Sequence, residues 1–200
     1  MVGTSLTARG DWPFQLGEAL AACRGGPVVV ERLARPGATS AWGRDALAAR
    51  LAAPGPPPTL ALIEFTVNDA RLHAGVPLAR SRAHAGKMTA LVRGRGGLPV
   101  LVTMSPVHGL ALLRRPAVAA YRRAWAGVAA AAGAGHVDTV PAFAVAERRE
   151  LREAIPDGIH PTDAAMRARL VPALTAVLEP LVRLSPGTAA SQLPLPSRRH

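Results

Sequence analysis

Two short stretches of the chain carry side chains that together can perform acyl transfer. "VGTSLTARG" places Ser5 in a glycine-containing turn, and "DGIHPTD" holds Asp157 and His160 three residues apart. A serine hydroxyl becomes nucleophilic at neutral pH when an imidazole accepts its proton, and a carboxylate can orient that imidazole. We therefore expect a catalytic triad in which Ser5 is the nucleophile, His160 its base and Asp157 the orienting acid.

The oxyanion that forms in such a reaction needs preorganised hydrogen-bond donors. The sequence offers the backbone N–H of Ser5, the backbone N–H of Gly37 in "RPGATS" and the side-chain amide of Asn68 in "FTVND". Each residue alone also has an ordinary structural interpretation, such as a serine that bonds its own turn or an asparagine that caps a helix. Their combination and order favour an oxyanion hole made by Ser5, Gly37 and Asn68.

Apolar runs that alternate with helical patterns must position these groups. We expect strands over Pro27–Leu33, Thr59–Phe65, Leu98–Met104 and Gly135–Val140. Because these runs are continuously apolar, they indicate a parallel sheet covered on both faces. We expect helices from Asp11 or Pro13 to about Cys23, from Ser40 to about Ala52, from Ser81 to about Arg93, from Pro116 to about Ala132, and from Thr162 towards Arg183 with a break or kink at Pro172 and Pro180.

Strands that alternate with helices predict a doubly wound α/β domain with right-handed crossovers. The chain has 200 residues, which is the length of one domain. We assign residues 1–184 to it and predict a disordered tail over 185–200, which is rich in proline and serine and lacks periodicity. In open α/β sheets ligands bind at the carboxyl ends of the strands, where the candidate catalytic groups stand.

These motifs resemble, in their order, the blocks of the SGNH hydrolases, also called the GDSL esterase/lipase superfamily. "GTSLT" resembles the first block, usually G-D-S-x-T, and "RPGATS" resembles the second, whose glycine donates to the oxyanion hole. "FTVND" resembles the third block, usually G-x-N-D, and "DGIHPT" resembles the fifth, D-x-x-H. Two residues differ from the usual pattern, since Thr4 stands in place of an aspartate and Thr66 in place of a glycine.

The resemblance implies a flavodoxin-like three-layer α/β/α sandwich that hydrolyses esters, thioesters or O-acetyl groups without a cofactor. We accordingly expect a serine esterase that forms an acyl-enzyme on a small-molecule, glycan or lipid ester, including O-acetyl and short-chain acyl esters. The alternative is a non-catalytic, flavodoxin-like binding module derived from the same fold. A nucleotide-binding protein is a poorer third, because the sequence contains neither a G-x-G-x-x-G nor a G-x-x-x-x-G-K-[ST] motif.

The glycine-containing turn that holds Ser5 is called the nucleophile turn below. The strand that leads into it is short in this sequence. Only Met1 and Val2 precede Gly3, whereas a central strand needs about five residues. In a flavodoxin-like order this truncated first strand lies between the second and the third, so both neighbours lose ladder partners. We expect the natural protein to begin upstream with a run of apolar β-formers, and a chain without that run to be less stable and less active.

The composition narrows the remaining classes of function. A single cysteine excludes an intrachain disulfide, and the six histidines show no metal-ligand spacing, so we expect no metal. The net charge is +11, but the arginines come in isolated pairs without interleaved aromatic residues, which argues against specific nucleic-acid binding. We expect no transmembrane segment and, because no signal peptide is visible, a cytoplasmic location by default.

Overall fold

The computed structural model describes residues 1–145 and 147–184, so the tail predicted over 185–200 lies outside the described residues. Its sheet has five parallel strands in the order β2-β1-β3-β4-β5, which is the flavodoxin-like order. The strands are β1 (Val2–Gly3), β2 (Leu33–Ala34), β3 (Leu60–Ile63), β4 (Leu98–Thr103) and β5 (Gly135–Asp138). The predicted α/β class with a parallel sheet is confirmed.

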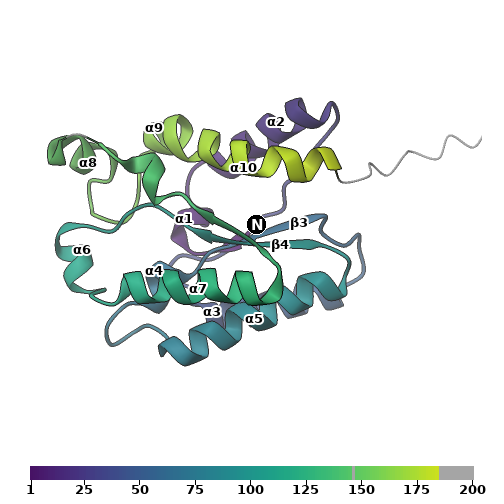
Figure 1. Cartoon of the computed structure of the whole chain (residues 1–200), viewed down its shortest axis with the longest axis horizontal. Coiled ribbons are helices and arrows are strands. Elements are labelled where there is room, and N and C mark those ends of the chain that lie inside the picture. The colour runs from purple at the N-terminus through teal and green to yellow at the C-terminus, as the bar shows by residue number, and fades with distance from the viewer. Residues whose placement is uncertain (146, 185–200) are drawn as a thin grey trace, which may run out of the picture.

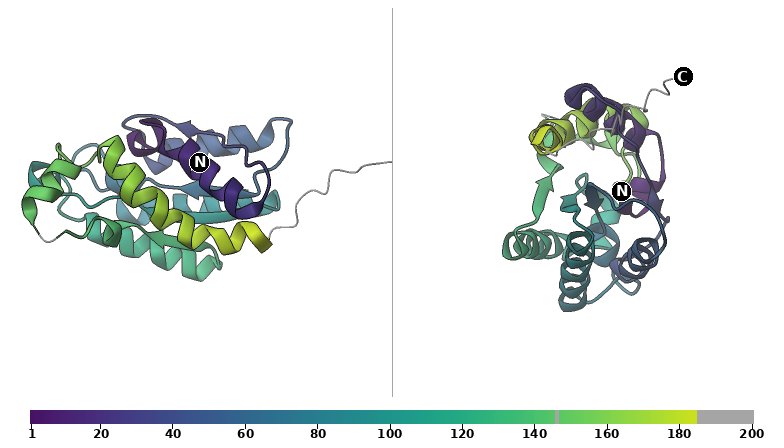
Figure 2. Two further views of the ribbon diagram at one scale, coloured as in Figure 1. Left: turned by 90° about the horizontal axis from the view of Figure 1, so that it is seen from above. Right: turned by 90° about the vertical axis from the view of Figure 1, so that its right-hand side faces the viewer.

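Helices cover both faces of the sheet and form the three predicted layers. Figure 1 shows α2 (Trp12–Arg24) and α10 (Val171–Leu184) above the sheet, where they pack against each other. Below it lie α3 (Ser40–Ala52), α5 (Leu78–Gly94) and α7 (Val118–Ala132), as the end-on view in Figure 2 also shows. The shorter elements are α1 (Ser5–Ala8), α4 (Thr66–Asp69), α6 (Gly109–Leu113), the 3₁₀ turn η1 (Val140–Phe143), α8 (Arg148–Ala154), α9 (Asp163–Ala165) and the π-helical turn η2 (Met166–Leu170).

The central strands are buried on both faces, as their continuous apolar runs predict. Successive side chains of a strand point to opposite faces. Leu62, Val100 and Val102 therefore join the core under α2 and α10, whereas Ile63 and Leu101 join the core over α3, α5 and α7. Both layers are consequently necessary to keep these strands out of water.

The strand expected over Pro27–Leu33 is wrong for most of its length. Only Leu33 belongs to β2, and the side chain of Val29 is 95% exposed. The reason is a short backbone partner: within the described part of the chain β2 pairs with β1 alone, and β1 contributes two residues. The ladder between β1 and β3 is equally short, with the single pair Val2 and Ile63.

The C-terminal helix breaks where its prolines predict a disturbance. The chain passes from α9 into the π-helical turn η2, and α10 begins one residue before Pro172. Proline has no N–H to donate within a helix and its ring crowds the preceding turn, so a widened turn ahead of it is expected. Pro180 lies inside α10.

Two helical glycines differ in what surrounds them, which gives a test of the packing on the α3 face. A Cβ on Gly43 in α3 would lie 2.2 Å from Cζ of the fully buried Phe65. A Cβ on Gly86 in α5 would have no atom within 4 Å. We expect Gly43→Ala to lower the free energy of unfolding by about 1–3 kcal/mol through overpacking.

Gly86→Ala is the matched control, and it should raise the free energy of unfolding by up to about 1 kcal/mol because alanine is the better helix former. Denaturant titration of both variants measures the difference. Equal stabilisation by the two substitutions would show that Phe65 does not pack against α3 in this way.

Candidate active site

Ser5 is the first residue of α1, and one residue, Thr4, separates it from the carboxyl end of β1. Thr4 caps this short helix, because its Oγ1 accepts a hydrogen bond of 3.2 Å from the backbone N–H of Leu6. The backbone N–H of Ala8 donates to the carbonyl of Thr4 over 2.9 Å. The turn therefore holds Ser5 at the edge of the sheet, where the residue keeps 8% of its surface exposed.

A chain of hydrogen bonds joins the three residues predicted as the triad. Ser5 Oγ lies 2.7 Å from Nε2 of His160, and Nδ1 of the same imidazole lies 2.6 Å from Oδ2 of Asp157. The other carboxylate oxygen of Asp157 accepts backbone N–H bonds from Ile159 and His160 at 2.9 and 2.7 Å. The structure thus brings Ser5 together with Asp157 and His160, which lie more than 150 positions further along the chain.

Asp157 is in a suitable state to orient the imidazole. Burial alone would raise the pKa of Asp157, but the hydrogen bonds from the backbone and the ring of His160 and from the backbone of Ile159 outweigh it and lower the pKa to about 2. The carboxylate is therefore ionised at neutral pH, and it can stabilise the imidazolium that forms when His160 takes a proton.

The loop between β4 and α6 supports the segment that carries Asp157 and His160. Ser105 Oγ donates to the carbonyl of Ile159 over 3.1 Å, and the backbone N–H of His108 donates to the carbonyl of Gly158 over 3.0 Å. Gly158 has a φ of +78°, and a Cβ there would lie 2.4 Å from the carbonyl oxygen of His108. The sequence alone led us to assign no catalytic role to Ser105 or His108, although both follow a buried strand.

The two other predicted oxyanion donors follow the strands on either side of β1. Gly37 lies after β2 in a turn with a φ of +74°, and Asn68 lies in α4 after β3. The side-chain nitrogen of Asn68 donates one N–H to the carbonyl of Ala38 over 2.8 Å, which joins the two loops. Among residues 1–145 and 147–184, no acceptor is found for the backbone N–H of Ser5 or Gly37 or for the second amide N–H of Asn68.

A buried carboxyl group next to Asn68 fixes the position of these two loops. Oδ1 of Asp69 accepts the backbone N–H of Ser40, the first residue of α3, over 2.8 Å. Oδ2 accepts the hydroxyl of Ser81 over 2.6 Å, and the indole N–H of Trp125 donates to the same hydroxyl. Burial raises the pKa of Asp69, while the bonds from Ser40 and Ser81 oppose the rise. Asp69 therefore ties the start of α3 to α4.

A second buried carboxyl group, that of Glu64, lies beneath the nucleophile turn, and sequence reasoning missed it. Glu64 follows β3, is 4% exposed and accepts hydrogen bonds from Thr4 and Thr7. Burial raises its pKa to about 7, although those hydrogen bonds act in the opposite direction. The sequence contains one signal for this residue, because Glu64 is an acidic residue inside the apolar run "TLALIEF". A carboxyl group is rarely fully buried without partners, so a glutamate in a buried run indicates that hydrogen-bond donors lie nearby.

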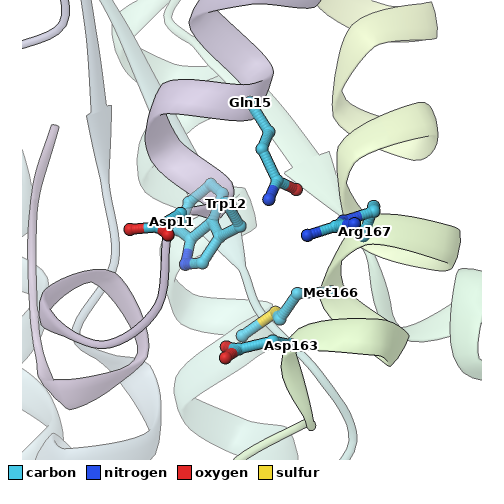
Figure 3. Close-up of a pocket in the computed structure, with 6 residues that line it drawn as sticks. All are labelled: Asp11, Trp12, Gln15, Asp163, Met166 and Arg167. Carbon is cyan, nitrogen blue, oxygen red and sulfur yellow. The ribbon is translucent and has the colours of Figure 1, made fainter.

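The small cavity drawn in Figure 3 lies apart from this chemistry. It has a volume of about 30 Å³, room for one or two water molecules, and none of the predicted site residues lines it. Figure 3 shows the side chains of Gln15 and Arg167 pointing toward each other across it, from α2 and from η2. The residues around it are Asp11, Trp12, Gln15, Asp163, Met166 and Arg167.

Two further observations concern metals and membranes. Within the part of the chain that the structure describes, no group of three or more His, Cys, Asp or Glu side chains is arranged to hold a metal ion. None of the helices described there is both long enough and apolar enough to cross a bilayer.

Solved structures share this fold over most of their length. The structure of TesA has a TM-score of 0.73 and 26% sequence identity, and the match covers 90% of this chain and 97% of that one. A lipase/acylhydrolase from Enterococcus faecalis has a TM-score of 0.74 and 19% identity, covering 90% and 94%. A catalytic mutant of Axe2, an acetylxylan esterase from Geobacillus stearothermophilus, has a TM-score of 0.63 and 18% identity, covering 88% and 90%.

The family comparison agrees with the motifs and with the fold. The family model described as the GDSL-like Lipase/Acylhydrolase family matches residues 1–168, a range that includes all four sequence blocks. Among curated proteins no sequence relative was found. Because the family match spans most of the chain and the flavodoxin-like sheet accompanies it, this chain belongs to the GDSL-like lipase/acylhydrolase family and is an esterase.

Proposed function

We propose that this esterase hydrolyses carboxylic esters through an acyl-enzyme formed on Ser5. The observation that carries the proposal is the pair of hydrogen bonds from Ser5 Oγ to His160 and from His160 to Asp157, at 2.7 and 2.6 Å. A nucleophile bonded to a base, and that base bonded to an orienting carboxylate, is the arrangement that activates a serine hydroxyl.

The proposed reaction has two halves that use the same groups. His160 Nε2 accepts the hydroxyl proton as Ser5 Oγ attacks the ester carbonyl carbon, and the oxyanion of the tetrahedral intermediate takes hydrogen bonds from the oxyanion-hole donors. The intermediate collapses, and His160 returns the proton to the departing alcohol. A water molecule, deprotonated by His160, then attacks the acyl-enzyme, which releases the carboxylic acid and restores Ser5.

We assign the oxyanion hole to the backbone N–H groups of Ser5 and Gly37 and the side-chain amide of Asn68. Two features support this assignment. The three residues follow β1, β2 and β3, which are neighbours in the sheet, and the bond from Asn68 to Ala38 holds the two outer loops together. Preorganised donors of this kind stabilise charge without having to reorganise during the reaction.

We propose O-acetyl and other short-chain acyl esters of small molecules, glycans or lipids as the substrates. The acetylxylan esterase among the structural neighbours is represented by three catalytic mutants, in which a serine, an aspartate or a histidine is replaced by alanine. The same three residue types form the hydrogen-bonded chain in the present protein. A non-catalytic binding module, the alternative function, would give no turnover and no covalent labelling of Ser5.

The triad assignment predicts the effect of three substitutions. Ser5→Ala and His160→Ala should each lower kcat for p-nitrophenyl acetate by about 10⁴-fold or more, because the nucleophile or its base is lost. Asp157→Ala should cost less, since it removes only the group that orients the imidazole. Fluorophosphonate labelling, read by mass spectrometry, should modify Ser5 in the wild type.

The control for His160→Ala is His73→Ala, because His73 lies exposed on the surface. It should retain wild-type turnover. Near-wild-type kcat in Ser5→Ala, or a fluorophosphonate adduct on another residue, would refute the assignment.

The oxyanion-hole assignment predicts a loss in kcat when the amide of Asn68 is removed. Asn68→Ala should lower kcat by about 10²–10³-fold, the cost of losing one side-chain donor. Asn68→Asp keeps the shape without the N–H donors, and it should lose at least as much. Steady-state kinetics separates the two constants, and a change confined to KM in both variants would exclude the role.

The substrate proposal predicts a preference among acyl chain lengths. With p-nitrophenyl esters from two to twelve acyl carbons, kcat/KM should be greatest at two to four carbons. Long-chain esters are the critical comparison, because the side chains of Leu110 and Leu113 on α6 are exposed. An exposed apolar surface of this kind could bind a long acyl chain. A maximum at eight or more carbons would overturn the short-chain proposal while leaving the mechanism intact.

A further inference from the structure

The carboxyl group of Glu64 contacts the nucleophile turn on both sides of Ser5. Its Oε1 accepts the backbone N–H of Thr4 over 2.6 Å and the hydroxyl of Thr4 over 2.9 Å. The same oxygen accepts the hydroxyl of Thr7 over 2.8 Å, and the Thr4 hydroxyl also lies 3.1 Å from Oε2. The side chain of Glu64, just after β3, therefore binds Thr4, the residue before Ser5, and Thr7, which lies two positions after Ser5.

The chain leaves space for this contact at Gly3. A Cβ at Gly3 would lie 2.3 Å from Oε1 of Glu64 and 2.3 Å from Oγ1 of Thr7, closer than any side chain permits. The φ of Gly3 is not positive, so the requirement for glycine comes from the approach of the carboxyl group rather than from the backbone.

Backbone pairing of β1 provides little support for the turn that holds Ser5. The hydrogen bonds of the Glu64 side chain therefore make up a larger share of the contacts that hold this turn in place. β1 has only one ladder pair with β3, and the backbone N–H of Glu64 donates to the carbonyl of Val2 over 3.1 Å. The side-chain bonds extend this contact past the end of β1 and into α1. They continue to Leu6, whose N–H donates to the same Thr4 hydroxyl.

Among the residues that the structure describes, Glu64 has no cationic partner that would explain it as half of an ion pair. The ion pairs found within the described residues, 1–145 and 147–184, do not include Glu64. The donors that satisfy it all belong to the nucleophile turn. A buried carboxyl group is expensive unless hydrogen bonds satisfy it, so the turn and the carboxyl group stabilise each other.

We propose that Glu64 is a positioning residue for Ser5, whose carboxyl group holds the Thr4–Thr7 turn so that the serine hydroxyl meets His160. The proposal rests on the proposed function, because Ser5 must be the nucleophile for its position to matter. It also accounts for Thr4, which stands where the family usually has an aspartate: here the carboxyl group comes from the neighbouring strand, and threonine supplies donors to it.

A positioning role has a kinetic signature that distinguishes it from substrate binding. Glu64 is buried behind the turn and does not contact Ser5 Oγ, so its loss should change the alignment of the nucleophile rather than the binding of the ester. A displacement of about 1 Å can cost about 10²-fold in rate. The effect should therefore appear in kcat and in the rate of fluorophosphonate labelling, with KM nearly unchanged.

The test compares five variants of the full chain with the wild type, and the fifth combines Glu64→Ala with the two threonine substitutions described below. Glu64→Ala removes the hydrogen-bond acceptor. Glu64→Gln keeps one carbonyl oxygen, which can accept from the backbone N–H of Thr4. It replaces the other oxygen with an NH₂ group, which can donate to a threonine hydroxyl. Thr4→Val/Thr7→Val removes the two hydroxyls and leaves Glu64 in place. Leu101→Ala is the stability control, because Leu101 is fully buried on β4, two strands away from β1.

We expect Glu64→Ala to lower kcat and the labelling rate by about 10²-fold with KM within about threefold of wild type. Glu64→Gln should recover kcat to within about fivefold, since neutral hydrogen bonds can still hold the turn. Thr4→Val/Thr7→Val should lose about as much as Glu64→Ala, and adding Glu64→Ala to it should cost little more, as expected for residues that act as one unit. Leu101→Ala, assayed where it is folded, should keep wild-type kcat.

Three results would overturn the proposal. They are a labelling rate in Glu64→Ala within threefold of wild type, a Glu64→Gln variant as slow as Glu64→Ala, or an equal loss of kcat in folded Leu101→Ala. If Glu64→Ala does not fold, the same comparison applies to the threonine double variant, where wild-type kcat would refute the role. Failure of the wild type itself to label at Ser5 would instead refute the proposed function, so the two failures are distinguishable.

Discussion

The hydrogen bond between Ser5 Oγ and His160 Nε2 is the contact on which the proposed chemistry of this molecule depends. It is 2.7 Å long and joins residues 155 positions apart. Neither end can find the other through local structure, so the sheet must deliver both. Parallel strands make this possible, because they bring the segments that follow them to a single edge. Figure 1 shows α1, α4 and α6 at that edge, each following a strand of the sheet.

Two buried carboxyl groups stabilise this edge in similar ways. Glu64 accepts the backbone N–H of Thr4 at the start of α1, and Asp69 accepts the backbone N–H of Ser40 at the start of α3. Both lie just beyond β3, so that one strand aligns the segment after its neighbour β1 and the segment after β2, which lies on the far side of β1. The first N–H groups of a helix have no partner within the helix, and a carboxylate also interacts favourably with its positive end. Burying these two polar groups is therefore compatible with a stable fold, because each is satisfied by hydrogen bonds.

The side chains that we propose for the chemistry and those that we propose hold them differ in what surrounds them. Asp157 stands in a half-exposed loop and keeps a pKa of about 2 through three N–H donors, whereas Glu64 is buried and has a pKa near 7. A group that must stabilise positive charge on His160 benefits from staying ionised. A group that only accepts hydrogen bonds from Thr4 and Thr7 has no such requirement, since a protonated carboxyl group keeps a carbonyl acceptor.

Much of the molecule follows from patterns that short stretches of sequence contain. The apolar runs indicate buried parallel strands, the segments between them indicate helices, and the four blocks point to Ser5, Gly37, Asn68 and the Asp157–His160 pair as candidate site residues. These features are local, because burial, helix capping and turn formation depend on residues close together in the chain. The same sequence gave no role to Glu64 and overestimated the strand that begins at Pro27.

The tertiary structure alone decided those two points, and the physical reason is the same for both. Whether Pro27–Leu33 forms a strand depends on a neighbouring backbone, and β1 offers only two residues to pair with. Whether Glu64 is a surface charge or a buried acceptor depends on Thr4 and Thr7, about 60 positions away. Sequence by itself determined which residues are candidates for the reaction and most of the segments that become strands or helices. Only the fold determined which distant groups meet, because hydrogen-bond partners so far apart leave no periodic pattern in the chain.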